Sequence, residues 1–320
     1  MTAHTPTPPG HSHYTLPPAH LLLALSIAFV WGTNFVVVKY ILAEWPPMFT
    51  AFMRYVVCFL PAAFFLKHPK VPIWNIATYG ILVGPGQFGL VYWAMDGMIS
   101  PGLTSVIIQT QVFFTVILAI IFEGERLKQF QWVALGLVGI GVLVIALNTY
   151  DGASGGETTA LGLAMVMFAA FLWAVSNTVV KRNGRINMLA FVVWASMYSL
   201  PPLFALSYFV DGPEVMWTAF TSTGPFIWSA VIWQTIGNTM FGFAMWGWLL
   251  ARHPSAAVAP MALLVPVLGI STSAVLLNEP LQTWKLSAAA LIIAGLSLNT
   301  LWPRLMHWCT QPAMRIPPSA

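Results

Sequence analysis

Charged side chains are scarce in this chain. Only 7% of its 320 residues are Asp, Glu, Lys or Arg, whereas 58% are hydrophobic. A soluble globular domain normally has about 25% charged residues, so this composition excludes an ordinary soluble protein. Crossing roughly 30 Å of hydrocarbon takes about 20 apolar residues per helix, and the chain contains ten such runs between short polar or Pro/Gly-rich breaks. The sequence therefore predicts an all-α polytopic membrane protein with ten transmembrane helices in a lipid bilayer.

Cysteine and histidine are sparse where chemistry would need them. The two cysteines, Cys58 and Cys309, lack the spacing of a disulfide framework or a metal site. His4, His11 and His13 lie in a Pro-rich first segment, and such a segment rarely holds ligands in a fixed geometry. An intramembrane enzyme would need a nucleophile and base, or metal ligands, clustered at membrane depth, and the sequence offers none. We therefore expect no catalytic centre, no metal and no cofactor.

The few charges carry information on topology rather than on partners. The net charge is +4, but the Lys and Arg residues form no stripe with interleaved aromatic residues, so we expect no nucleic-acid partner. The loops are also too short to carry an obligate protein partner. Lys and Arg gather at alternate loop ends, which predicts cytoplasmic termini. The residues concerned are Lys67, Lys70, Arg126, Lys128, Lys181, Arg182, Arg185, Arg252, Arg304 and Arg315. Lys285 and most acidic residues, including Glu279, fall at the outer ends, and an outer loop is expected over 211–223.

The second half of the chain repeats the first in outline. Leu103–Leu127 resembles Ala257–Leu281, about 154 residues later, and the two stretches end in the similar sequences GERL and NEPL. Each copy has five predicted helices, an odd number, so the second copy should cross the membrane in the opposite sense. Inverted repeats of this kind place a binding site near the membrane midplane, where the halves meet. The predicted organisation is a disordered cytoplasmic tail (1–18), a first repeat (19–148), a periplasmic linker (149–159), a second repeat (160–303) and a cytoplasmic tail (304–320).

Amide side chains interrupt the apolar runs and are the first candidates for that site. They are Gln87, Gln109 and Gln111, with Asn34, Asn177 and Asn238. Lipid cannot satisfy an amide, so each must face protein or water. Gln109 and Gln111 lie about 200° apart around a helix, so we expect one to line a pathway and the other to tie helices together. Interhelical hydrogen bonding without ligand contact is the alternative for all six.

Proline and glycine mark places where helices should break or approach closely. Pro85 and Gly86 lie in the third predicted helix, and Pro260 and Pro266 in the ninth. Proline removes a backbone hydrogen bond and can open a helix toward a cavity, so these four are predicted hinge positions. The glycines at 136, 139 and 141 are spaced like a dinucleotide-binding fingerprint, but no strand precedes them. Helix packing is the better interpretation.

Several short sequences resemble those of one transporter family. They are WGTNFVV (31–37), GQF (86–88), QTQVFFT (109–115), VAP (258–260) and LLVPV (263–267). Over about Leu21 to Leu301 the chain resembles the drug/metabolite transporter superfamily, and within it the EamA family of ten-helix exporters. The resemblance implies a bacterial inner-membrane carrier that exports small metabolites by alternating access. It implies amino acids or their derivatives, such as cysteine and O-acetylserine, as the cargo.

A zwitterionic cargo would need donors for its carboxylate, acceptors for its ammonium group and a dry aromatic wall. Amides supply donors and acceptors without a buried charge. Arg54 and Lys39 could meet the carboxylate, although Lys39 lies near a helix end and could reach the membrane surface instead. The candidate wall residues are Trp31, Trp173, Trp194 and Trp246, with an interfacial or lipid-facing position as the alternative. The fifteen tryptophans also leave open efflux of aromatic amino acids or of bulky aromatic or cationic compounds.

Overall fold

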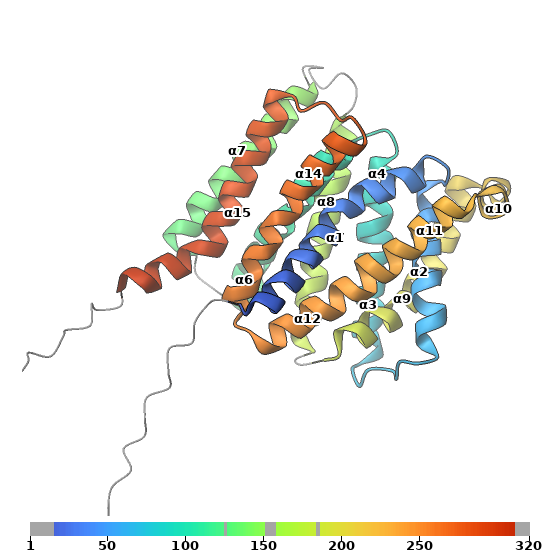
Figure 1. The fold of residues 1–320 in the computed structure, drawn as a ribbon, viewed down its shortest axis with the longest axis horizontal. Helices are drawn as coiled ribbons and strands as arrows, with labels where there is room; N and C mark the ends of the chain where they lie inside the picture. Colours follow the sequence, from blue (N-terminus) through green and yellow to red (C-terminus); the bar gives the residue numbers. More distant parts are fainter. Residues whose placement is uncertain (1–15, 125–126, 151–157, 184–185, 311–320) are drawn as a thin grey trace, which may run out of the picture.

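The computed structural model describes residues 16–124, 127–150, 158–183 and 186–310. Arg126, Arg185, and most of both predicted tails and of the 149–159 linker lie outside these residues. Helices form in each of the ten apolar runs of the sequence, and some of them change helix type along their length (Figure 1). We call each such helix, or continuous series of helices, a rod. Seven of these segments are long and apolar enough to cross a membrane; α2 is a shorter apolar helix.

The first half contains five rods, two of which change helix type along their length. They are α1 (Pro18–Leu42), α2 (Pro47–Ala63), α3 (Ile73–Ile81) continued by η1 (Leu82–Gly89) and α4 (Leu90–Met95), α5 (Pro101–Ile107) continued by η2 (Ile108–Thr110) and α6 (Gln111–Glu123), and α7 (Gln129–Tyr150). Proline, which lacks the N–H that a first turn leaves unpaired, begins three of these rods at Pro18, Pro47 and Pro101.

The second half follows the same order with one addition. Its elements are α8 (Ala160–Arg182), α9 (Met188–Leu206) continued by η3 (Ser207–Asp211), α10 (Pro213–Ser222), α11 (Pro225–Trp233) continued by η4 (Gln234–Phe241) and α12 (Gly242–Arg252), α13 (Ser255–Val258) continued by η5 (Ala259–Leu263) and α14 (Leu264–Leu276), and α15 (Thr283–Thr310). The expectation of a plain loop over 211–223 is wrong, because α10 forms there. Pro213 starts this helix, which buries Met216 and Ala219 and exposes Trp217. The last helix also extends into the predicted tail as far as Thr310.

The two halves pack so that equivalent helices exchange roles. Helix α1 of the first half packs on α14 of the second half. The equivalent helices are α8, which corresponds to α1, and α6, which corresponds to α14, and these two also pack on each other. The equivalent pair α2 and α9 pack on each other, as do α7 and α15, which run side by side along one edge of the molecule (Figure 1). Each pairing maps onto itself or onto another when the halves are swapped, which is the pattern of a two-fold relationship.

The third rod of each half contains a π-helix at the same place. Segments η1 and η4 are both eight residues long and begin 152 positions apart, at Leu82 and Gln234. Pro85 and Gly86 lie inside η1, where the proline removes a backbone donor. Pro260 lies in the 3-10 segment η5, and Pro266 lies near the start of α14. π-helical turns are rare and often mark functional positions. Segments η1 and η4 are therefore candidates for contributing residues to a site between the halves.

Only one of the three spaced glycines of α7 is in a tight contact. A Cβ on Gly141 would lie 2.8 Å from Ile292 Cγ1 and 3.0 Å from the Ala288 carbonyl oxygen of α15. Gly295 of α15 makes the reciprocal approach, since its Cβ would lie 2.7 Å from Val138. Nothing lies within 4 Å of a Cβ on Gly139. The close approach of α7 and α15 therefore depends on Gly141 and Gly295.

We expect Gly141→Leu to lower the thermal unfolding midpoint of the purified protein in detergent, because the new side chain must push α7 away from α15. Overpacking of this kind typically costs about 1–3 kcal/mol. The matched control is Gly139→Leu, on the same helix, which should leave the midpoint nearly unchanged. Equal effects of the two substitutions would contradict the assignment of Gly141 as the contact residue.

Candidate functional site

Arg54 is a buried cation whose polar contacts are all neutral. It lies on α2 and is 1% exposed. Its guanidinium donates hydrogen bonds to the Tyr92 hydroxyl and, over 2.8 Å, to Thr239 Oγ1. The Phe88 ring centroid lies 3.7 Å from the guanidinium carbon. Arg54 Nε has no hydrogen-bond partner. Within the described residues no carboxylate pairs with Arg54.

The partners of Arg54 come from both halves of the chain. Tyr92 lies on α4 in the first half, and Gln234 of η4 in the second half donates from Nε2 to the Tyr92 hydroxyl over 2.8 Å. Thr235 Oγ1 also donates to the Arg54 carbonyl oxygen at 3.3 Å. Two of the π-helical segments, η1 and η4, contribute directly, since Phe88 belongs to η1 and Gln234 and Thr239 to η4. We call Arg54, Phe88, Tyr92, Gln234 and Thr239 the arginine cluster.

Two buried acceptor atoms without partners belong to η1 and η4, the segments that supply Phe88, Gln234 and Thr239. Gln234 Oε1 and Gln87 Oε1 are both buried and unpaired. Gln234 already contacts Tyr92, and Gln87 immediately precedes Phe88. A buried acceptor left unpaired costs about 1–3 kcal/mol. The cluster thus combines an unsatisfied cationic donor with unsatisfied neutral acceptors, which is the complement of a group that carries both a carboxylate and an ammonium.

Three of the other predicted amides, Gln109, Gln111 and Asn177, take part in hydrogen bonds between the two halves. Asn177 Nδ2 donates to Gln111 Oε1 over 3.1 Å, which joins α8 to α6. Gln109 is 8% exposed, and its Nε2 donates to the Ala262 carbonyl oxygen at 3.4 Å. Both glutamines therefore bond across the halves, and cargo contact by either one stays a prediction. Asn34 Oδ1 on α1 is buried and unpaired.

The predicted wall tryptophans separate into different environments. Trp31 packs with Trp246 at a centroid distance of 5.2 Å and with Phe243 at 5.8 Å, and its Nε1 donates to the Asn238 carbonyl oxygen over 3.1 Å. Phe243 and Trp246 lie on α12, which directly follows η4, the segment that carries Gln234 and Thr239 of the arginine cluster. Trp173 instead packs against the main hydrophobic core.

Two predicted site residues contact helix ends rather than the arginine cluster. Trp194 Nε1 donates to the Leu66 carbonyl oxygen at 3.0 Å, just beyond the end of α2, and its ring packs on His68. Lys39 Nζ donates to the Met95 carbonyl oxygen at 3.2 Å, at the last residue of α4. A cation at a helix C-terminus is stabilised by the unpaired carbonyls there. Lys39 and Trp194 thus bond to residues outside the arginine cluster.

Four members of the arginine cluster were not selected from the sequence: Phe88, Tyr92, Gln234 and Thr239. The signal for Gln234 was present, since it is an amide inside an apolar run. Tyr92 and Phe88 look like ordinary apolar or interfacial residues in a sequence, and only their position beside Arg54 distinguishes them. No group of three or more His, Cys, Asp or Glu residues in the described part of the chain could hold a metal ion.

A separate cavity of about 410 Å³ opens near the end of α1. Three carboxylates, from Glu44, Asp96 and Asp211, line it together with Trp45 and Trp93. Asp211 is already engaged, because its Oδ2 accepts hydrogen bonds from the Phe49 backbone N–H and from Ser207 Oγ. This acidic cavity contains none of the arginine cluster.

Comparison with known proteins gives consistent results along the whole chain. The sequence profile of the EamA-like transporter family matches residues 19–147 and 160–301. A protein of Escherichia coli (strain K12) named "Probable amino-acid metabolite efflux pump" is 34% identical over 284 residues, which cover 87% of this chain and 93% of that protein. An "Uncharacterized inner membrane transporter YedA" of the same organism is 25% identical over 295 residues, or 89% of this chain and 91% of that protein.

The fold is also found among solved structures. One of them, titled only "Crystal structure of protein", superposes with a TM-score of 0.60 at 19% identity and covers 91% of this chain and 99% of that chain. At this identity the likeness concerns the fold alone. Because the family profile matches both halves, and because the 34% identical relative is covered over nearly its whole length, this chain belongs to the EamA-like transporter family.

Proposed function

We propose that this chain exports small amino-acid-type metabolites across the bacterial inner membrane by alternating access. Its family is one of membrane transporters and not of enzymes. The printed name of the E. coli relative supports amino-acid metabolites as the cargo class, with cysteine and O-acetylserine as our first candidates. The YedA relative's name supports the inner membrane. The proposal includes ten spans, in two inverted five-helix repeats, with both termini cytoplasmic.

The observation that carries the proposal is the buried Arg54 guanidinium, which has no carboxylate partner among the residues that the structure describes. Removing a charge from water costs several kcal/mol unless a counter-charge or strong hydrogen bonds compensate. Two hydroxyl groups and an aromatic face compensate in part. A carboxylate brought by the cargo would complete the pairing, and guanidinium binds carboxylates through strong, oriented hydrogen bonds. Arg54 is therefore the residue we assign to the cargo carboxylate.

The unpaired acceptors of Gln87 and Gln234 suit the other end of an amino acid. Gln87 Oε1 and Gln234 Oε1 can each accept a hydrogen bond from an ammonium group without placing a negative charge in the membrane. The residues of the cluster carry one positive charge, and a bound zwitterion leaves that total unchanged while giving each charge a partner. A purely cationic compound would instead place a second positive charge near Arg54, which disfavours the cationic efflux alternative.

The architecture supports alternating access. The arginine cluster is built from both halves, so relative motion of the halves would open or close the space around it. Segments α5 and α14, which belong to equivalent rods, contact each other in antiparallel order. Gly102 lies by Glu279, Ser105 by Gly269 and Gln109 by Ala262. Equivalent rods that run antiparallel are what inverted repeats require.

A second candidate, export of aromatic amino acids, is favoured by one specific observation. Trp31, Phe243 and Trp246 form an aromatic group, and Trp31 is bonded to the backbone of Asn238 in the same π-helix that supplies Gln234. A flat side chain could pack against such a surface. In this candidate the carboxylate would still bind Arg54, and only the wall would select the side chain.

We expect proteoliposomes that contain the protein to release labelled cysteine, O-acetylserine or another amino acid of a test panel faster than empty vesicles. The physical reason is that the carrier supplies hydrogen bonds that replace those which water makes with a zwitterion. Release should saturate with the internal concentration, because a binding site is involved. Release at the rate of empty vesicles for every member of the panel would contradict the proposed function.

We expect Arg54→Gln to lower efflux of carboxylate-bearing cargo by about tenfold to hundredfold, the range that a lost hydrogen bond to a charged group supports. The matched control is Arg182→Gln, because Arg182 is exposed at the end of α8. Equal efflux for the two variants at equal amounts of folded protein would contradict the assignment. Tyr92→Phe keeps the ring and removes the hydroxyl to which Arg54 and Gln234 both donate, so its half-saturating concentration should rise.

Competition distinguishes the two cargo candidates. If the aromatic group faces the cargo, unlabelled tryptophan or phenylalanine should inhibit cysteine release at lower concentrations than alanine does. Trp246→Ala should remove that difference, since it removes part of the wall and leaves Arg54 in place. A permanently cationic dye should not compete, because Arg54 repels it. Strong inhibition by the dye together with none by any amino acid would favour the cationic efflux alternative.

A further inference from the structure

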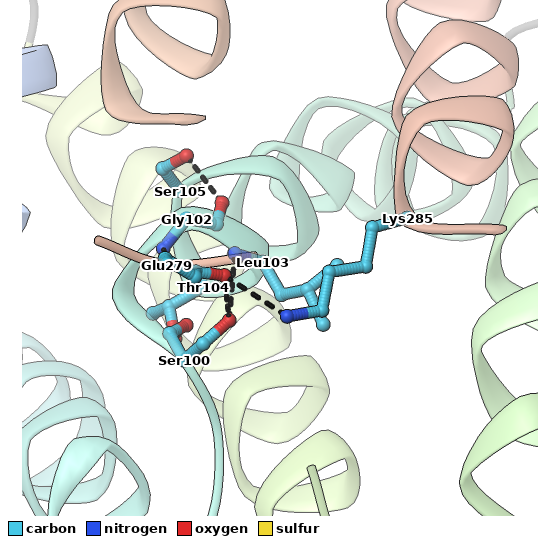
Figure 2. Close-up of polar contacts among 7 residues, drawn as sticks. All are labelled: Ser100, Gly102, Leu103, Thr104, Ser105, Glu279 and Lys285. Carbon is cyan, nitrogen blue, oxygen red and sulfur yellow. Dashed lines mark hydrogen bonds and ion pairs between the residues drawn. The ribbon is translucent and has the colours of Figure 1, made fainter. Parts of the chain in front are cut away.

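Glu279 forms a polar contact between the halves at the end where α5 begins. Its carboxylate accepts hydrogen bonds from Ser100 Oγ and, over 3.0 Å, from the Gly102 backbone N–H. Lys285, at the start of α15, forms an ion pair with the same carboxylate at 3.3 Å. Figure 2 shows the Lys285 side chain reaching toward Glu279 beside the first turn of α5. Both side chains are mostly buried, with 9% of Glu279 and 5% of Lys285 exposed.

The contact suits the chemistry of a helix start. The first N–H groups of a helix have no partner within the helix and carry a partial positive charge, so a carboxylate there is stabilised. Gly102 makes the approach possible, because a Cβ at this position would lie 2.8 Å from Glu279 Oε2. All three of the nearest atoms to that Cβ belong to the Glu279 carboxyl group. The space that a side chain at position 102 would need is thus occupied by the Glu279 carboxyl group.

This contact is the outermost of a series between equivalent rods. One turn further along α5, Ser105 lies directly against Gly269 of α14, with no room for a Cβ on that glycine. Deeper still, Gln109 bonds to the carbonyl of Ala262. The seam between the α5 and α14 rods is therefore closed from the Glu279 contact to the Gln109 contact. A cargo path to this end of the molecule must open it, starting with the Glu279 contact.

We propose that the contact of Glu279 with Ser100 and Gly102 is the latch of the outer gate. Glu279 is a positioning residue: it holds the start of α5 against the second half and keeps the outer end shut while the arginine cluster is buried. Opening to the outside breaks the two hydrogen bonds to α5 and leaves Glu279 paired with Lys285, which lies in the same half. The ion pair keeps the released carboxylate neutralised in both states.

The inference rests on the alternating access proposed above, and its test measures gate opening without cargo. Cys58 and Cys309 are replaced by alanine, and Ser105→Cys supplies a single reporter thiol inside the α5–α14 seam. A membrane-impermeant maleimide is applied to right-side-out vesicles, and to inside-out vesicles in parallel. The buried reporter should react slowly from the outer face when Glu279 is intact, because it is exposed only when the seam opens.

Adding Glu279→Gln should raise the rate of labelling from the outer face by about tenfold or more, as expected for losing a charged hydrogen-bonding partner. Gly102→Ala should change the rate in the same direction, because its methyl group displaces the carboxylate while Glu279 itself remains. The matched control is Glu214→Gln, an exposed acid in the first turn of α10, which should leave the rate unchanged. Thermal unfolding midpoints confirm that the compared variants are folded.

Unchanged labelling in both folded latch variants would overturn the proposal, as would an equal increase from both faces, which indicates general loosening. The two proposals fail separately. Altered labelling with no efflux of any cargo would contradict the proposed cargo but not the proposal that Glu279 latches the gate. Normal efflux with unaltered labelling would contradict the gate alone.

Discussion

A positive charge held in an apolar interior is the constraint on which the rest of this structure depends. Arg54 is nearly inaccessible, yet within the described part of the chain its guanidinium contacts hydroxyl groups and aromatic rings and no carboxylate. Such a group is tolerated only if its surroundings are fixed, so helices from both halves converge on it. The same arrangement leaves Arg54 Nε and the acceptors of Gln87 and Gln234 unpaired. These unpaired atoms are the ones that we propose bind the cargo.

The halves are joined at three depths by contacts of different kinds. At the end where α5 begins, a carboxylate holds a helix start through Glu279. In the middle, amides bond across the seam through Gln109 and through the Gln111–Asn177 pair. Toward the other end, Asn75 Nδ2 donates to Asn183 Oδ1 over 2.6 Å. Each contact is a small number of hydrogen bonds. Such contacts can break at one end while those at the other persist, as rocking of two rigid halves requires.

Much of the fold could be predicted because membrane helices satisfy their backbones locally. Apolar length and short breaks located the ten rods, and the amides in those runs located the layer between the halves. Helix α10 was missed because a ten-residue helix with mixed polarity looks like a loop when it follows Gly212. The π-helices were missed as such, although Pro85 correctly marked one of them as irregular.

The candidate site could be predicted only in part, because side-chain partners distant in the sequence decide it. Arg54 is a candidate from the sequence alone, but Tyr92 and Thr239 are identified only by the hydrogen bonds that they accept from it. Lys39 resembled Arg54 in the sequence, yet it binds the end of α4. The sequence places Glu279 at an outer end of a helix and gives it no partner. Its contact with Gly102, which lies 177 positions earlier, is visible only in the structure.

The most direct test of the central claim is a binding cycle in detergent solution. The affinity of an amino acid and of its methyl ester, which lacks the carboxylate, is measured for the parent protein and for Arg54→Gln. The account predicts that the substitution weakens binding of the amino acid by about tenfold or more and does not weaken binding of the ester, a cation that Arg54 repels. An equal loss for both ligands, or no loss for either, would contradict the assignment of Arg54 to the cargo carboxylate.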